Sequence, residues 1–384
     1  MFALEELRRL RAFASRRLQN PHGQQLGAYL DTVDWTAALR DRPLVPWDMS
    51  LGFFTPFWAG LTEEQQLALN HWTYAMMYFR IGDGERFVVN TNTVVADVVE
   101  AFEPELAGLL RLETHEEVDH IAAFTRVFAA VQQRHGFVAA KMPVKPLRPL
   151  FISRPFLRLL VSAFGADFVA TYYLGRGLVN HMGKAFETRV ASLGEGSPAL
   201  TKLSLLHTVD ENRHMAVSRM MAAASYELLH RRRRRSALYE AASRAMQRTV
   251  VRYTFSDRIT TNQERAMSLR MLPQMRSLSA VAPEVLRGCI AAHFDGVTGI
   301  EHAKNAFMPR FNQRLMERAC LSGHEKRMWF DLLNSLQRNL QFFPEGWRPG
   351  DGLVTEAFDD EPPAGSAPGS GGAGPGRRDD RLPL

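Results

Sequence analysis

Two short patterns of glutamate and histidine are the residues of this chain best suited to do chemistry. Glu117 and His120 form a Glu-x-x-His pattern, and residues 207–214 form a His-x-x-x-Glu-x-x-His pattern. Helical residues three, four and seven positions apart lie on one face, so each pattern would present its carboxylates and imidazoles together. Such oxygen and nitrogen donors can bind a transition-metal ion. The donors of the second pattern are His207, Glu211 and His214.

The second pattern is the stronger signal, because two polar residues at Glu-x-x-His spacing occur on many solvated helices. It lies in mid-helix beside apolar residues such as Leu206 and Met215, where an unpaired carboxylate or imidazole would be costly to bury. A metal ion removes that cost. Two Glu-x-x-His motifs on separate helices of a bundle indicate a dinuclear carboxylate site, to which each of the other helices adds a Glu. Glu85, flanked by apolar residues, is the candidate from the first helix.

The sequence around these motifs reads as consecutive long helices separated by Gly and Pro. We expect helices from Thr62 to about residue 102 (irregular near residues 82–84), from Pro104 to about residue 134, from about residue 155 to 192, and from Pro198 to about residue 230. Two helical hairpins of this kind make a four-helix bundle. The predicted fold class is all-α, a ferritin-like four-helix bundle core with additional N- and C-terminal helices.

Three regions follow from this pattern. We expect residues 1–45 to form N-terminal covering helices and residues 46–350 to form one ferritin-like di-iron helical domain with C-terminal helices. Residues 351–384 should be a disordered tail, because a segment rich in Gly and Pro has little apolar surface to bury.

Composition excludes several function classes. Of 384 residues, 46% are hydrophobic and 23% are charged, as in ordinary globular proteins. Only two cysteines are present, so a disulfide framework and a cysteine-based zinc or iron–sulfur site are excluded. A net charge of +6 does not indicate nucleic-acid binding. With no long apolar run and no apolar signal core, we expect a cytoplasmic protein with neither membrane nor nucleic-acid partners.

The motifs resemble the p-aminobenzoate N-oxygenase family of ferritin-like non-haem di-iron oxygenases. That family carries an extra histidine upstream of its last motif, here His207, and residues 207–214 are similar to that motif. The segment TPFWAGLTEEQ at residues 55–65, followed by Glu85, resembles the approach to the family's first ligand. The resemblance covers about residues 50–220. It implies that two iron ions are bound by Glu85, Glu117, His120, His207, Glu211 and His214.

One ligand of the family has no counterpart here. The family has a Glu on its third helix, about 27 residues before the extra histidine, and that count lands on Asn180, beside His181. Glu187 is two turns away, about 10 Å along the helix, too far to substitute without a changed register. We expect His181 to replace the missing ligand, since an amide such as Asn180 binds iron only weakly. The alternative is that His181 is a polar core residue and the position has no protein ligand.

Other residues near the motifs have two interpretations each. Asp119 and Asp210 could orient imidazole N–H groups or could face solvent. Arg213 could pair with such a carboxylate. Tyr173 could line a substrate pocket or belong to the core.

The resemblance implies a di-iron monooxygenase that uses O2 to oxidise a small organic substrate. The reaction that the resemblance implies is N-oxygenation of an aromatic amine to hydroxylamine, nitroso or nitro products in secondary metabolism. Two Fe ions are the expected cofactor, with manganese as an alternative, and no catalytic residue beyond the metal site is expected. No flavin or haem motif is present, so an external electron donor or reductase is needed, and a homodimer is left open.

Three alternatives remain at this stage. The same metal pair could catalyse C-hydroxylation or desaturation. The chain could instead be a ligand-depleted, non-catalytic relative of the same fold. Iron storage is disfavoured because storage bundles lack the added C-terminal helices where a substrate pocket could form.

Overall fold

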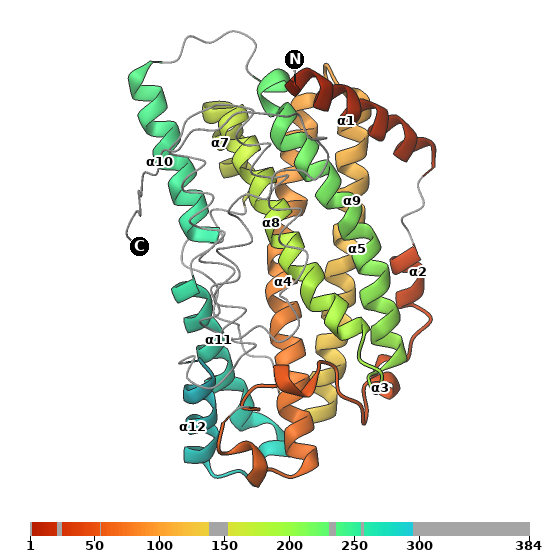
Figure 1. Cartoon of the computed structure of the whole chain (residues 1–384), viewed down its shortest axis with the longest axis vertical. Coiled ribbons are helices and arrows are strands. Elements are labelled where there is room, and N and C mark those ends of the chain that lie inside the picture. Colours follow the sequence, from red (N-terminus) through yellow and green to blue (C-terminus); the bar gives the residue numbers. More distant parts are fainter. Residues whose placement is uncertain are drawn as a thin grey trace, which may run out of the picture.

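The computed structural model describes residues 2–20, 25–53, 55–137, 153–229, 236–254 and 257–294. Every regular element in these ranges is helical, and none is a strand, which confirms the predicted all-α fold class. The bundle consists of two hairpins whose helices run along the long axis of the molecule (Figure 1). They are α4 (Glu63–Val99) with α5 (Pro104–His135), and α8 (Ala166–Ala191) with α9 (Pro198–Leu229).

Capping residues set the ends of the helices in the first hairpin. The Thr62 side chain accepts from the Gln65 backbone N–H, and the Gln65 side chain accepts from the Thr62 N–H, so a capping box starts α4. Helix α4 then continues unbroken through residues 82–84, so the irregularity predicted there is wrong. Pro104 occupies the first turn of α5, and Gly136, at φ 67°, ends that helix in the left-handed conformation.

The third predicted helix is in fact two helices. Helix α7 (Arg154–Phe164) ends at Gly165, and α8 starts directly after it. Gly165 has φ 50° and ψ −121°, a conformation that a residue with a side chain adopts only with strain. Glycine therefore allows the chain to change direction at this point, and α7 packs against both α4 and α8.

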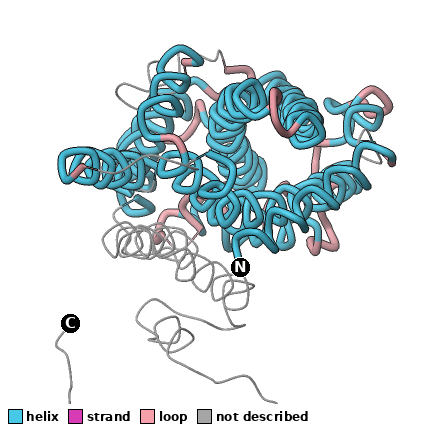
Figure 2. Tube along the Cα trace, turned by 90° about the horizontal axis from the view of Figure 1, so that it is seen from above, coloured by secondary structure: helices cyan, strands magenta, loops and turns pink. Residues whose placement is uncertain are grey.

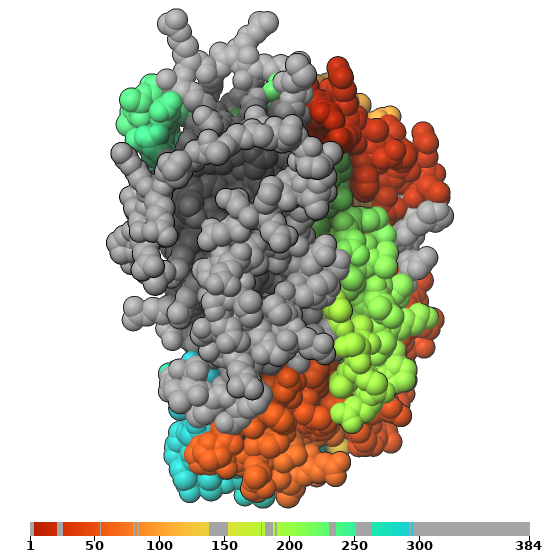
Figure 3. Space-filling view, viewed as in Figure 1, coloured from red at the N-terminus to blue at the C-terminus, as the bar shows by residue number. Residues whose placement is uncertain are grey.

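Further helices surround the bundle. Helix α1 (Phe2–Gln19) lies across α5 and α9, and α2 (Gln25–Leu30) and α3 (Trp35–Ala38) follow it onto the same two helices. Helix α10 (Ala237–Thr254) packs on α8, while α11 (Asp257–Met271) and α12 (Pro283–Phe294) pack on each other. Seen from above, the helices form one cluster (Figure 2). On the face shown in Figure 3, the green α8–α9 hairpin lies beside the red N-terminal helices.

Short 3-10 turns connect these elements. They are η1 (Trp47–Met49), η2 (Trp58–Gly60), η3 (Leu272–Gln274) and η4 (Arg276–Leu278). The predicted tail at residues 351–384, and the part of the chain from residue 295, lie outside the described residues. None of the described helices is both long and apolar enough to cross a membrane.

Two apolar clusters fill the bundle, one toward each end. The first contains residues from 94–99, 106–110, 168–174 and 217–228. The second contains residues from 68–78, 123–131 and 200–203, together with the N-terminal loops and parts of α11 and α12. The segments carrying the glutamate and histidine motifs lie between these clusters along each helix. The fold therefore buries this polar layer beneath apolar side chains on both sides.

Candidate metal centre

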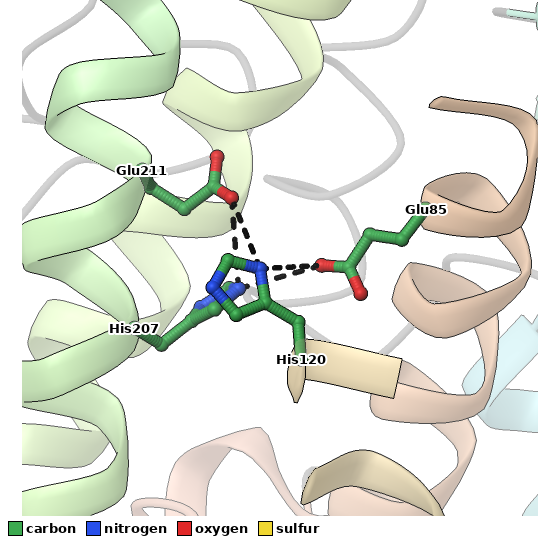
Figure 4. Close-up of side chains that lie close together, drawn as sticks. All are labelled: Glu85, His120, His207 and Glu211. Carbon is green, nitrogen blue, oxygen red and sulfur yellow. Dashed lines mark hydrogen bonds and ion pairs between the residues drawn. The ribbon is translucent and has the colours of Figure 1, made fainter. Parts of the chain in front are cut away.

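Six of the seven predicted ligands converge in the middle of the bundle. Figure 4 shows Glu85 from α4, His120 from α5, and His207 and Glu211 from α9 pointing toward one another. Their ligand atoms lie within 4.8 Å of one another. A second group with the same spacing shares His120 and Glu211 with the first and is completed by Glu117 and His214. Two overlapping groups of four donors are the arrangement that a pair of ions requires.

The distances within the first group suit a shared ion. Glu85 Oε1 lies 3.4 Å from His207 Nε2 and 3.6 Å from His120 Nδ1. Glu211 Oε1 lies 3.7 Å from His207 Nε2 and 3.6 Å from His120 Nδ1. Two donors that are each about 2.1 Å from an ion stand about 3 Å apart at a right angle. Small adjustments would bring all four donors onto one ion.

The second group is tighter. His214 Nδ1 lies 3.1 Å from Glu211 Oε1 and 3.2 Å from Glu117 Oε1. His120 Nδ1 lies 3.4 Å from Glu117 Oε2. His120 and Glu211 belong to both groups, but the one free nitrogen of His120 can bind only one ion, so only the Glu211 carboxylate can serve both groups.

Unsatisfied atoms show that these residues fit metal ions. Four buried atoms of the cluster make no hydrogen bond to any described residue. Buried polar atoms are normally hydrogen-bonded, and an unmet carboxylate or imidazole is costly. All four belong to predicted ligands, so metal coordination accounts for them. They are Glu85 Oε2, Glu117 Oε2, Glu211 Oε2 and His120 Nδ1.

Each histidine of the cluster is held from behind by a carboxylate. His120 Nε2 is 3.3 Å from Asp210 Oδ2, and His214 Nε2 is 2.9 Å from Glu116 Oε2. His207 Nδ1 is 2.6 Å from Glu187 Oε1. In each ring the other nitrogen faces the cluster. This carboxylate–histidine arrangement fixes the tautomer and ring orientation of metal-binding histidines.

The formal charges are compatible with two divalent ions. Seven buried carboxylates contact the three histidines or their neighbours, and three arginines pair with these carboxylates. With neutral imidazoles, four negative charges remain uncompensated, which is the charge that two divalent cations supply. The carboxylates are Glu85, Glu113, Glu116, Glu117, Glu187, Asp210 and Glu211, and the arginines are Arg17, Arg176 and Arg213.

In the metal-free protein, protonated histidines neutralise part of the negative charge of the carboxylates. Burial alone would lower the pKa of His207, but the Glu187 and Glu85 carboxylates together outweigh it and raise the pKa to about 10. Burial likewise opposes protonation of His120 and His214, yet the surrounding carboxylates raise both pKa values well above the usual range. Metal ions must displace these protons before the nitrogens can bind.

The other predicted site residues lie at different distances from the cluster. Asp210 orients His120, as described above, and Arg213 pairs with both Asp210 and Glu116. Asp119 instead lies against Gly27 of α2, where its carboxylate leaves no space for a side chain. The Tyr173 hydroxyl donates to Asn92 Oδ1 at 3.1 Å and makes no described contact with the six ligand candidates.

The third-helix position leaves the predicted replacement of the missing ligand untested. Asn180 is partly exposed, and its Nδ2 makes no hydrogen bond with a described residue. The side chain of His181 lies outside the described residues, so its predicted role as a ligand stays a prediction. Glu187, judged from the sequence to be too far away to replace the missing ligand, belongs to neither group of donors and instead accepts from His207 Nδ1. The register of α8 against α9 brings Glu187 level with His207, and the spacing count alone could not show this.

Sequence reasoning missed four further participants. Glu113, Glu116 and Glu187 are buried carboxylates on the motif-bearing hairpins, and Arg176 is a buried guanidinium on α8. Only Arg176 carried a signal in the sequence, because it lies within a mostly apolar stretch, whereas Glu113 and Glu116 lie among other polar residues of the motif. Glu116 and Glu113 also fall one and four residues before Glu117, on the same helix.

Comparison with known proteins gives one partial match. No curated protein matches the chain. Residues 44–145 match the family model described as acyl halogenase CylC-like. That span holds α4 and α5, and with them Glu85, Glu117 and His120, but not the motif on α9. The matched family model therefore describes a different oxidative family from the N-oxygenases that the motifs resemble. Over the first hairpin of its bundle, the chain is thus similar to the CylC-like acyl halogenases.

Proposed function

We propose that this protein is an oxidative enzyme with a dinuclear non-haem metal centre, which uses O2 to modify a small organic substrate. One observation carries the proposal. Three histidines and three glutamates from three helices meet in two overlapping groups, with unsatisfied buried atoms and a carboxylate behind each histidine. A structural polar network would instead satisfy its own donors and acceptors.

The protein's own residues have separable tasks in such a centre. Redox-active ions such as iron would supply the binding and reduction of O2 when bound. Glu85 and His207 would bind one ion and Glu117 and His214 the other, Glu211 could serve both, and the free nitrogen of His120 would bind one of them. Asp210, Glu116 and Glu187 keep the ring nitrogens aimed at the ions. The apolar clusters on either side exclude water, which strengthens every electrostatic contact inside.

Halogenation of an acyl chain is the reaction that we place first. The match to the acyl halogenase family model supports it, because the matched span carries Glu85, Glu117 and His120. Replacing a C–H hydrogen by chloride with O2 as oxidant consumes one chloride, one O2, two electrons and three protons, and releases two waters. The two electrons require an external donor.

N-oxygenation of an aromatic amine is the second candidate. The residues 207–214, which lie outside the matched span, support it through their similarity to the N-oxygenase motif. Conversion of an amine to a hydroxylamine also consumes one O2 and two electrons. Hydroxylation and desaturation of carbon need the same inputs, so the inputs do not separate these reactions.

Product analysis distinguishes these candidates. The protein is loaded anaerobically with Fe(II) or Mn(II) and then given O2, a chemical reductant and chloride. The probes are the decanoyl thioester of N-acetylcysteamine and p-aminobenzoate, with products identified by mass spectrometry. A Glu211→Ala variant should be inactive, whereas Glu195→Gln, at an exposed loop position, should behave as wild type.

Each outcome has a defined meaning. A chlorinated acyl product supports the halogenase assignment, and an arylhydroxylamine supports the N-oxygenase assignment. A hydroxylated or unsaturated acyl product keeps the oxidative enzyme and replaces its reaction. A protein that binds two metal ions but never consumes O2 contradicts the proposal and leaves a non-catalytic relative of the fold.

A further inference from the structure

A line of hydrogen bonds leads from the candidate metal site to the buried Tyr78 on α4. His207 Nδ1 lies 2.6 Å from Glu187 Oε1, and the Tyr78 hydroxyl donates to the same oxygen at 2.8 Å. All three side chains are buried. The phenol is thus separated from a candidate metal ligand by a single carboxylate.

Aromatic rings surround this line. The rings of Tyr74 and Tyr78 are stacked, with centroids 4.2 Å apart and an interplanar angle of 30°. The ring centroid of Phe124 lies 4.4 Å from that of Tyr78 and 5.2 Å from that of His207. Close aromatic contacts in a water-free core favour electron transfer and protect a ring that has lost an electron from reacting with solvent.

The phenol can lose an electron only together with its proton. Burial raises the pKa of Tyr78 well above its usual value, so a phenolate is strongly disfavoured in this core. The Glu187 carboxylate, at hydrogen-bond distance, is a base placed to accept the proton. The geometry therefore allows proton-coupled electron transfer, in which the proton of Tyr78 passes to Glu187 and the electron passes toward His207.

We propose that Tyr78 is a redox-active residue that supplies one electron to the metal centre through the Glu187–His207 line. The inference rests on the proposed function, since the oxidant is the metal pair after oxidation by O2. In the step, the Tyr78 O–H bond breaks, its proton moves to Glu187 Oε1 and one electron reduces the metal pair. The products are a neutral phenoxyl radical and a protonated Glu187. Tyr78 would thus provide an electron when the external donor is slow.

Other buried tyrosines lack this connection. Tyr172 and Tyr173 are also buried, but both hydroxyls donate to Asn92 Oδ1, at 3.2 and 3.1 Å. An amide oxygen is too weak a base to take a phenol proton. The Tyr173 ring therefore serves as a matched control, because it differs from Tyr78 in its acceptor and not in its burial.

The test is electron paramagnetic resonance of iron-loaded protein, frozen at intervals from milliseconds to seconds after mixing with O2. Wild type should give an organic radical signal that narrows when the protein contains ring-deuterated tyrosine. Tyr78→Phe should lose the signal to background, and Tyr173→Phe should keep it. Metal content, helicity by circular dichroism and oxidation of the ferrous ions by O2 are measured in parallel on every sample.

The parallel measurements separate two kinds of failure. If wild type binds two ions that O2 oxidises, yet gives no tyrosine signal or keeps it in Tyr78→Phe, the tyrosine proposal is overturned and the proposed function stands. If wild type binds no metal pair, or the ions do not react with O2, both are overturned. A purely structural Tyr78 would change thermal stability in the variant without any radical signal in the wild type.

Discussion

Arg176 on α8 donates through one terminal nitrogen to Glu117 Oε1 and through the other to Glu113 Oε2, each at 2.6 Å. The same Glu117 oxygen lies 3.2 Å from His214 Nδ1. One carboxylate is therefore shared between a buried guanidinium and the metal cluster. This pairing fixes the orientation of Glu117 and withdraws electron density from it, which weakens its donation to a metal ion.

Removing that guanidinium should cost more in the metal-free protein than in the loaded one. Arg176→Gln removes the guanidinium that Glu113 and Glu117 share, for which we expect a loss of up to roughly 3–5 kcal/mol in the free energy of unfolding. Bound ions would compensate Glu117, so the loss should be smaller when metal is present. Urea unfolding with and without metal measures both values.

A surface pair provides the control for this variant. Arg126→Gln removes an exposed arginine that pairs with Asp31, and the expected change is within about 1 kcal/mol. Equal losses for Arg176→Gln in the loaded and metal-free protein would show that Glu117 does not bind metal.

Two metal ions per chain are expected, and their binding should depend on the shared ligands. Glu211→Gln removes a charge common to both groups of donors, so both ions should be lost or bound far more weakly. His115→Gln alters an exposed histidine on the same helix as His120 and should leave metal content unchanged. Elemental analysis of the purified proteins measures the ratio. A single ion per wild-type chain would contradict the dinuclear assignment.

Metal binding near neutral pH should release protons. The pKa of His207 is raised to about 10, and those of His120 and His214 are raised well above their usual range, so all three rings are protonated in the metal-free protein. Because coordination requires unprotonated nitrogens, we expect a release of about three protons and an affinity that falls as pH decreases. Calorimetry in buffers of different ionisation enthalpy counts the protons, and a count near zero would refute this view of the cluster.

A buried pair of histidines outside the candidate metal site should make the protein less stable as the pH falls. His135 and His71 share a hydrogen bond of 3.0 Å, and burial lowers the pKa of His71 to about 4 and of His135 to about 3. Below the unfolded pKa of about 6.5, the unfolded chain binds protons that the folded chain excludes. The stabilisation is therefore complete above pH 6.5 and is lost progressively as the pH falls toward 4.

A variant comparison isolates this effect from titration of the metal cluster. The free energy of unfolding is measured from pH 4 to 8 for wild type and for the double variant His71→Asn with His135→Gln. The advantage of wild type over the variant should shrink by a few kcal/mol between pH 7 and pH 4. A difference that stays constant with pH would contradict the assigned pKa values.

The sequence predicted the bundle well because its signals were local. Capping residues at Thr62, Pro at the start of α5 and the periodicity of long apolar faces each act within a few residues. The spacing of His207, Glu211 and His214 placed them on one face for the same reason. These features need no knowledge of how distant helices pack.

What the sequence could not predict depended on registration between helices. Glu187 meets His207 only because the α8–α9 turn fixes how far one helix is displaced along the other. Arg176 meets Glu117 through the contact between separate hairpins. The break at Gly165 was missed because glycine is tolerated within helices, and nothing local showed that its φ would be positive. For Glu187 and Arg176, the deciding interaction joins residues far apart in sequence.

The N-terminal helix has a consequence for the order of synthesis. Arg17 of α1 pairs with Glu116, the carboxylate behind His214, and α1 packs on α5 and α9. A ribosome releases α1 first, yet its docking surface is incomplete until residue 229 has emerged. Helix α1 can therefore complete its contacts with the bundle only after α9 has been made, so we expect the Arg17–Glu116 pair to form late.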